Sequence, residues 1–333
     1  MTVPSAYIKV FGYAASIFFL YLTFKDAKFS LILNYLSIAN IYCLLGALCL
    51  NIGFYAVRGL YQINNLYFIK SDIPFLISFS SIGIAQFYNV IFPARLGEVI
   101  RTYFLSNKQG LKKASVLSYI FLEKILDILV ILLLLLLVIY LNIYSTELIN
   151  SLFRFSFITI LLITLVIIFF RFNRYFLLLV DKIAPQSTHD LIYKFNCQVL
   201  EGIRFYKTTG QVLKSILLLL LSWAVMLGIF GLVSYPYVKL FGMPYYSCLV
   251  FMVFSILSLS VPSAPAGIGV MHYGLFLAVK ILLGGNIPPS QINLVAAFVI
   301  SMHFSLILLD VITGGGVLIY SKFSRREYNL ANG

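Results

Sequence analysis

The feature that most constrains the fold is a run of apolar residues, ILVILLLLLLVIYL, at 128–141. It is apolar on every side of a helix and lacks the apolar–polar alternation of an outer-membrane strand. Of the 333 residues, 61% are hydrophobic and only 11% are charged, whereas soluble domains carry roughly 25% charge. A soluble core could not hide this much apolar surface. The sequence therefore predicts an all-α, polytopic helical membrane protein.

The net charge is +13. In a membrane protein, we interpret this excess as positively charged cytoplasmic loops and attraction to anionic lipid headgroups, rather than as a nucleic-acid surface. The four cysteines show no metal-ligand spacing, and no phosphate-binding loop for ATP is present. We therefore predict no metal, no cofactor and no nucleic-acid partner.

Basic residues set the predicted topology of the apolar segments. The loop at 172–211 and the tail after 320 are rich in Lys and Arg, so both are predicted to be cytoplasmic, as is the N-terminus. The pattern at 186–210 predicts an amphipathic helix in this loop, either at the interface or as a connector beneath the bundle. The topology must then assign each of nine apolar segments either to a full membrane span or to part of a re-entrant hairpin. These segments are 5–24, 38–58, 74–92, 113–142, 152–171, 212–235, 245–262, 266–284 and 291–320.

Two parts of the chain fit these charges only if each enters and leaves the membrane on one side. Residues 74–105 are predicted to turn at Pro93, because Pro ends one helix and suits the first turn of the next. Residues 245–284 are predicted to enter from the opposite side. The predicted fold is one membrane domain with about six full spans and two oppositely oriented re-entrant hairpins. Its span–hairpin–span units, typical of an inverted repeat in transporters, cover 38–142 and 212–320.

Ionisable residues gather around the first hairpin, in PARLGEVIR at 93–101 and FLEKILD at 121–127. Charges inside a membrane are costly and usually pair or face a cavity. The helix break at Pro93 and Gly97 exposes backbone N–H groups to an anion, and arginine donors suit phosphate. An arginine of the hairpin is the predicted partner of the acidic residues on the next helix. The candidate binding residues here are Asn89, Arg95, Glu98, Arg101, Glu123 and Asp127.

The second hairpin contains PSAPAGIGVMH at 262–272. Its predicted turn residues are Pro262, Pro265, Gly267 and Gly269. His303 and Asp310 lie on one stripe of the last span, so both can face His272, and these three are further candidate binding residues. An ionic lock that only fixes helix packing remains the alternative for the charged residues, and satisfied core histidines for the two His.

In this order the motifs resemble the lysylphosphatidylglycerol synthase transmembrane region, also called the flippase-like domain. The chain departs from that pattern where Ala266 follows Pro265 and where His272 stands at a position often occupied by Glu. The resemblance implies a multi-pass inner (plasma) membrane protein that translocates or handles an anionic or amphipathic lipid, here without an attached soluble synthase domain. It is carried by Asn89, Pro93, Arg95, Gly97, Glu98 and Arg101, by Glu123, Lys124 and Asp127, and by Pro262, Pro265, Gly269 and Val270.

We therefore predict a lipid flippase-like transporter that binds a phosphate-bearing or otherwise anionic headgroup between the two hairpins. The expected partners are membrane lipids, either an anionic phospholipid or a polyprenyl phosphate. Association with a separate lipid-modifying enzyme or with a second copy of the chain is left open. The alternative is a membrane-embedded enzyme or accessory subunit acting on a lipid-linked substrate of a phospholipid, polyprenyl-phosphate sugar or hopanoid pathway. No catalytic residue is assigned.

Overall fold

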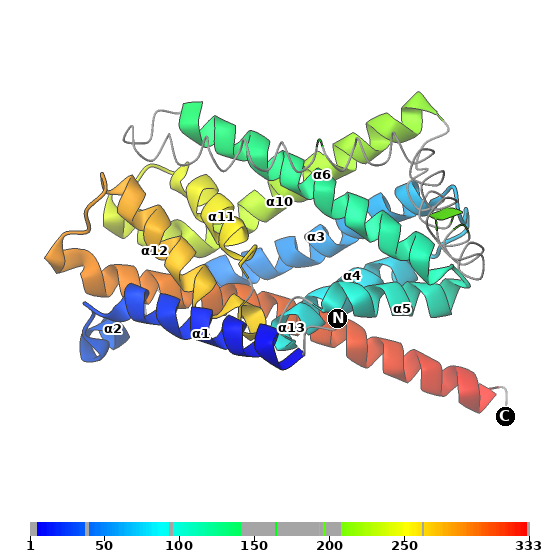
Figure 1. Ribbon diagram of the computed structural model, residues 1–333, viewed down its shortest axis with the longest axis horizontal. Coiled ribbons are helices and arrows are strands. Elements are labelled where there is room, and N and C mark those ends of the chain that lie inside the picture. Colours follow the sequence, from blue (N-terminus) through cyan, green and yellow to red (C-terminus); the bar gives the residue numbers. More distant parts are fainter. Residues whose placement is uncertain are drawn as a thin grey trace, which may run out of the picture.

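The computed structural model describes residues 5–36, 40–92, 96–140, 164, 193, 196–197, 208–261 and 263–331. Within these ranges the regular structure is helical and contains no strand, which confirms the predicted all-α class (Figure 1). The predicted span at 152–171 and the predicted amphipathic helix at 186–210 lie almost entirely outside the described residues. Of the predicted site and turn residues, Pro93, Arg95 and Pro262 also lie outside them.

The described chain forms ten α-helices, with 3-10 turns at Pro265–Gly267 and Pro289–Gln291. Most of their bounds are close to the predicted segments. The exceptions are the short α2, which the sequence did not predict, and α3 and α13, which continue to Leu66 and Ala331 beyond their predicted ends at 58 and 320. The helices are α1 (Ser5–Phe24), α2 (Phe29–Leu36), α3 (Ile41–Leu66), α4 (Phe75–Ile91), α5 (Gly97–Gln109), α6 (Lys113–Tyr140), α10 (Thr209–Phe241), α11 (Ser247–Ser258), α12 (Val270–Leu282) and α13 (Ile292–Ala331).

Four helical stretches of the described chain are long and apolar enough to cross a membrane, at 41–66, 209–241, 265–282 and 289–321. They confirm a polytopic helical membrane protein. In the third stretch a 3-10 turn precedes α12, which has only 13 residues. At about 1.5 Å per residue α12 is about 20 Å long, short of the roughly 30 Å hydrocarbon core. We therefore keep α12 as one arm of the predicted second hairpin.

Helices α3 and α10 pack against each other in the middle of the molecule and carry much of the main apolar core. Helix α3 continues to Leu66, two turns beyond the predicted end at 58. Its last turns are polar but buried, because their amides bind neighbouring helices. The Asn64 amide donates to the Ser215 hydroxyl at 2.7 Å, and Ser215 in turn donates to Asn65. Polar residues can therefore extend this buried helix beyond its apolar run.

Helices α4 and α5 form a hairpin whose two ends return to the same side. At the open end, the Lys70 ammonium donates to the carbonyl of Gln109 at 3.0 Å. Near the tip, a Cβ placed on Gly97 would lie only 1.9 Å from the carbonyl oxygen of Ala85. Glycine is therefore required for the close approach of the two arms. Helix α5 ends at Gly110, which has φ +66° and accepts the left-handed conformation that ends many helices.

Helices α11 and α12 form a second hairpin, and Gly274 lets its arms approach at Ser258. Figure 1 shows α4 and α5 at one end of the long axis and α11 and α12 towards the other, with α13 running beneath both. The two hairpins therefore point towards each other from opposite ends, which is the arrangement that an inverted repeat requires. The repeat itself stays a prediction.

Candidate functional site

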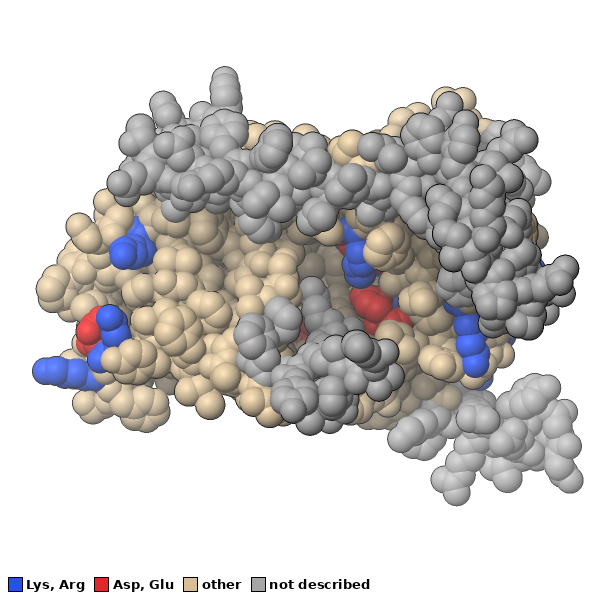
Figure 2. Space-filling model, in the orientation of Figure 1, with Lys and Arg blue, Asp and Glu red and all other residues tan. Residues whose placement is uncertain are grey.

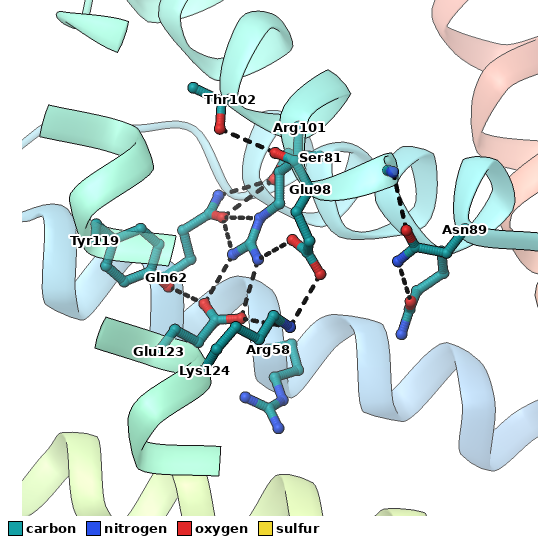
Figure 3. A network of polar contacts seen from close by, with 12 residues as sticks. Arg58, Gln62, Ser81, Asn89, Glu98, Arg101, Thr102, Tyr119, Glu123 and Lys124 are labelled. Carbon is teal, nitrogen blue, oxygen red and sulfur yellow. Dashed lines mark hydrogen bonds and ion pairs between the residues drawn. The ribbon is translucent and has the colours of Figure 1, made fainter. Parts of the chain in front are cut away.

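Arg101 is the centre of a buried polar cluster where α3, α5 and α6 meet (Figure 3). Its guanidinium donates five hydrogen bonds to protein acceptors. Nε and Nη2 donate to the Gln62 amide oxygen at 2.9 and 2.5 Å, and both terminal nitrogens donate to Glu123 at 3.0 and 2.9 Å. The fifth bond goes from Nη1 to Glu98 at 3.3 Å. Because a guanidinium has five N–H groups, these acceptors use all of its donors.

Two further cations complete this cluster. The Lys124 ammonium lies 2.9 Å from a Glu98 oxygen and 3.8 Å from Asp127. Asp127 also accepts from Arg58 Nη2 at 2.6 Å and from the Trp223 indole at 3.2 Å. The described cluster therefore pairs three positive with three negative side chains, and its formal charge is zero. Neutral pairing is how charges are tolerated inside a membrane protein.

Lys124 is the most exposed member of this cluster: 44% of its side chain is accessible, against 2% for Arg101. Figure 2 shows a face that is largely uncharged, with basic and acidic side chains meeting in a hollow near its centre and others towards the ends. The cluster is therefore a buried set of ion pairs that joins neighbouring helices and reaches the surface only at Lys124. It is not an open basic pocket.

A cavity of about 380 Å³ lies between the tips of the two hairpins. The last turns of α4 contribute Gln86 and Asn89 to its wall, and the end of α11 and the following turn contribute residues from Ser255 to Gly267. Helix α13 contributes His303 and Asp310 on its other side. Segments far apart in the sequence thus form one space between the hairpins, whose mainly apolar wall carries a few convergent polar side chains.

Asn89 shapes the first hairpin at this cavity. Its amide oxygen accepts from the backbone N–H of Gly97 at 2.9 Å, and its amide nitrogen donates to Gln86 at 3.3 Å. The first bond joins the end of α4 to the start of α5 across the tip. It satisfies one of the N–H groups that a helix start leaves without a partner. Asn89 therefore both lines the cavity and holds the hairpin tip.

Asp310 faces the cavity from α13 and is bound by α3. It accepts from the Tyr55 hydroxyl at 2.9 Å and from the Asn51 amide at 3.4 Å. The same amide donates to the Thr313 hydroxyl at 3.2 Å. A small polar layer between α3 and α13 therefore fixes the position of this carboxylate.

His272 of α12 and His303 of α13 contact each other, as the sequence predicts. His303 Nδ1 and His272 Nε2 are 3.3 Å apart, and the two rings are nearly perpendicular. His303 also reaches the carbonyl of Ala266 in the turn of the second hairpin, at 2.9 Å from Nε2. The pair thus ties this turn to α13 at the wall of the cavity.

Comparison with known families matches residues 9–309 to the lysylphosphatidylglycerol synthase TM region. This range contains both hairpins, the polar cluster and both paired histidines. The chain belongs to this family. No curated protein and no solved structure matches the chain. The family makes it a membrane protein of a lipid-related group, and confirms the resemblance that the motifs indicate.

A second, almost wholly apolar groove of about 330 Å³ is present in this family member. It lies between α3, α4 and α13, and its lining includes Ile52, Phe79, Thr313 and Gly316. A Cβ on Gly316 would meet nothing within 4 Å, so this glycine leaves open space. In the sequence of α13, the residues that line the groove begin at Ile312, just after Asp310, the last residue that lines the cavity.

The structure divides the sequence-predicted residues into two groups. Arg101, Glu98, Glu123 and Asp127 belong to the ion-pair cluster and are not among the described residues that line the cavity. This corrects the expectation that Arg101 and the acidic residues surround one common space, because the helix interface of α3, α5 and α6 encloses them. The second group lines the cavity, and consists of Asn89, Gly267, His303 and Asp310. His272 belongs to neither group: it contacts His303 but is not among the described residues that line the cavity.

Sequence reasoning missed the contributions of α3. Arg58 binds Asp127, Gln62 binds Arg101, and Asn51 and Tyr55 bind Asp310. The available signal was a series of polar residues in an apolar helix, recurring every three or four positions from 51 to 62. This spacing places them along one face of α3.

Proposed function

We propose that this protein is a lipid flippase-like transporter in which the cavity between the hairpins holds the polar headgroup and the adjacent groove holds a hydrocarbon chain. The observation that carries the proposal is the order of the two spaces along α13. Residues 303–310 of α13 line the cavity, where the polar side chains of His303 and Asp310 converge among apolar ones, and residues 312–320 line a groove that is almost wholly apolar. An amphipathic molecule matches this order, whereas a wholly water-soluble molecule would leave the groove without a partner.

The chemistry of the headgroup follows from the polar lining. The amide groups of Gln86 and Asn89 and the hydroxyl of Ser263 offer several hydrogen-bonding groups in a small space, whereas both ring nitrogens of His303 are hydrogen-bonded within the protein. Arg95 is the phosphate contact that the sequence predicts; it lies outside the described residues, three positions after the cavity residue Phe92 in the sequence. In this proposal Arg101 does not contact the lipid. It positions the first hairpin through its bonds to Gln62 and Glu123.

Filling the cavity tests the proposal. Purified protein is reconstituted into vesicles of phosphatidylcholine and phosphatidylglycerol that contain a trace of acyl-labelled fluorescent phosphatidylglycerol, and dithionite reports the label in the outer leaflet. Ile307→Trp adds bulk to the cavity wall, and we expect it to slow movement of the label between leaflets severalfold. Ile319→Trp is the matched control, because Ile319 is on the same helix, is 60% exposed and lines neither space. It should keep the wild-type rate.

Equal rates for the two variants would contradict a role of the cavity in lipid movement. The same preparation tests the alternative of a membrane-embedded enzyme. We expect the lipids extracted after incubation to be chemically unchanged. A modified phospholipid formed by the pure protein would favour the enzyme over the transporter.

A further inference from the structure

The described wall of the cavity between the hairpins carries charge of one sign only. Asp310 is the only Asp or Glu in the described lining, and no described Lys or Arg belongs to it. The ion-pair cluster uses its own cations, because Arg58, Arg101 and Lys124 bind carboxylates there. A phosphate is negatively charged and offers only acceptors, so at this wall it would meet a carboxylate without a described cation. The group that contacts this wall is therefore another part of the headgroup.

Hydrogen-bond donors are available on the first hairpin. The Gln86 carbonyl accepts from Asn89, but the amide nitrogen of Gln86 donates to no described residue. Asn89 gives one N–H to Gln86, and its second N–H has no described acceptor. Both side chains are half-buried and line the cavity. Since an amide nitrogen carries two N–H groups, donors from both residues remain for an occupant of the cavity.

The second hairpin supplies hydroxyl groups to the same cavity. Ser260 and Ser263 line it at the turn, and Ser255 lines it from the last turns of α11. The Ser255 hydroxyl is buried and has no partner among the described residues. By contrast, the hydroxyl of the equally buried Ser222 donates to a carbonyl of its own helix. A buried polar group without a partner costs free energy, which a bound molecule recovers if it supplies the missing hydrogen bond.

These donors and acceptors must be satisfied together, and that requirement selects the chemistry of the occupant. An ammonium has only donors, so it would suit Asp310 but would face the amide N–H groups of Gln86 and Asn89 with further donors. A phosphate has only acceptors, so it would suit the amides but not the carboxylate. A hydroxyl both donates and accepts. Several hydroxyls on one molecule therefore satisfy the amides, the serines and the carboxylate at once.

The rest of the wall suits the carbon skeleton of such a molecule. The rings of Phe92 and Phe230 line the cavity, and most of the remaining lining is aliphatic. His303 adds no free group, because both of its ring nitrogens are bound within the protein. A polyol can place its C–H groups against the apolar wall and direct its hydroxyls to the few polar side chains. An apolar wall with a few convergent polar groups is typical of small-molecule sites.

We propose that the cavity recognises a neutral, hydroxyl-rich group, such as glycerol or a sugar, in a lipid headgroup. The amides of Gln86 and Asn89 donate to its oxygens. Asp310 accepts from its hydroxyls, and the Ser255 hydroxyl gains the partner that it lacks within the described protein. This selectivity rests on the proposed function, which brings a headgroup into the cavity. It favours lipids with several free hydroxyls over those that end in a bare phosphate or an amine.

Binding is measured separately from lipid movement. Dioctanoyl forms of four lipids are titrated into the full-length protein in a neutral detergent, and the shift in unfolding temperature gives the apparent affinity. Phosphatidylglycerol and phosphatidylinositol carry free hydroxyls, phosphatidic acid carries only phosphate, and phosphatidylethanolamine carries an ammonium. Phosphatidic acid is at least as negatively charged as the first two. General attraction to a basic protein therefore cannot explain a preference for the hydroxyl-bearing lipids.

We expect the better of the two hydroxyl-bearing lipids to bind at least about tenfold more tightly than phosphatidic acid or phosphatidylethanolamine, because these two leave polar groups of the wall unpaired. The order of phosphatidylglycerol and phosphatidylinositol distinguishes an open-chain polyol from a ring. Phosphatidic acid or phosphatidylethanolamine binding as tightly as the hydroxyl-bearing lipids would overturn the proposal.

Ser255→Ala tests the wall itself. It removes a hydroxyl without a described partner, so the protein without added lipid should remain as stable as wild type. Affinity for the preferred lipid should fall about fivefold, the typical effect of one hydrogen bond. Ser247→Ala is the matched control, because Ser247 is on the same helix, is equally buried without a described partner, and is not among the described residues that line the cavity. It should keep the wild-type affinity.

Gln86→Leu removes the amide donors and should lower the preference for the hydroxyl-bearing lipids towards that of phosphatidic acid. If this variant fails to fold, Ser255→Ala and its control still decide the question. Equal affinities of Ser255→Ala and Ser247→Ala would overturn the proposed site.

The vesicle assay, with acyl-labelled phosphatidylglycerol and phosphatidic acid, separates this site from the transport function. Selective binding without movement of either lipid would overturn the transporter and leave the hydroxyl site. Movement of both lipids without selective binding would overturn the hydroxyl site and leave the transporter.

Discussion

The ion pair between Arg101 and Glu123 gives the most direct test of how the first hairpin is held. Replacing Arg101 by Met removes five hydrogen bonds and leaves the Glu123 carboxylate, 2% exposed, without its main cation. The Tyr119 hydroxyl at 2.5 Å still donates to it, but Lys124 is 3.7 Å away. Removing one partner of a buried pair typically costs about 3–5 kcal/mol. At about 1.4 kcal/mol per factor of ten, the folded-to-unfolded ratio should fall by roughly a hundred- to several-thousand-fold.

The second substitution, Glu123→Gln, should recover much of this loss. It removes the unpaired charge and keeps an oxygen that can accept from Tyr119. The remaining cluster of Arg58, Lys124, Glu98 and Asp127 is again neutral. Buried ion pairs replaced as a unit often cost little, because two desolvated charges disappear together. The double variant should therefore be more stable than Arg101→Met alone, with a coupling energy of about 2 kcal/mol or more.

Unfolding can be followed by the fluorescence of the single tryptophan, Trp223, during titration of detergent micelles with a denaturing detergent. This side chain donates to Asp127, so it reports on the cluster itself. Additive losses in the two single variants and the double variant would refute the pairing argument. A loss below about 1 kcal/mol for Arg101→Met would do the same, because that is the range of exposed ion pairs.

The same double variant distinguishes a structural role of Arg101 from a direct role in binding the lipid headgroup. If Arg101 only positions the hairpin, restoring its stability should also restore lipid movement between leaflets in the vesicle assay. A double variant that folds but moves no lipid would return Arg101 to the role of headgroup ligand that its sequence pattern suggests.

Three further tests, two of them with a matched control substitution, follow from the packing. Gly97→Ala should destabilise the protein by several kcal/mol, because its Cβ would collide with a carbonyl of α4, whereas Gly53→Ala, with open space around it, should be neutral or slightly stabilising in the same unfolding assay. Asp127→Leu should cost about 3–5 kcal/mol by leaving a buried arginine unpaired, while Lys124→Met, at the exposed edge, should cost less than about 1 kcal/mol. Trp223→Phe should cost about 1 kcal/mol, the typical value of one lost hydrogen bond, measured by thermal aggregation because the fluorescent reporter is removed.

Much of the helical architecture could be predicted because it depends on local information. Apolar run lengths locate most helices, and prolines and glycines locate the hairpin tips. The contact of His272 with His303 and the pair of Arg101 with Glu123 also follow, since each requires only that a hairpin return beside a known helix. The structure adds α2, whose Ile32 packs against the first turns of α13. The eight-residue sequence of α2 does not indicate this long-range contact.

What the sequence could not settle was the choice between equivalent partners. Asp127 pairs with Arg58, which is 69 residues away on a helix with no predicted role in the site. Helix angles and depths decide this choice, and they depend on the packing of α3 against α10. The separation of the ion-pair cluster from the cavity has the same origin, because one face of α5 is buried against α6 while the tip of α4 faces the second hairpin.

The bond between Arg101 and Glu123 also has a consequence for the order of membrane insertion during synthesis. Helix α5 is short and polar, and an arginine near the centre of a bilayer costs at least about 2.5–3.5 kcal/mol without a partner. Its carboxylate partner lies 22 residues later in the chain. At about 5–20 residues per second, the arginine waits roughly one to four seconds for that partner to leave the ribosome. The first hairpin should therefore settle at its final depth only together with α6, which makes these helices one unit of insertion.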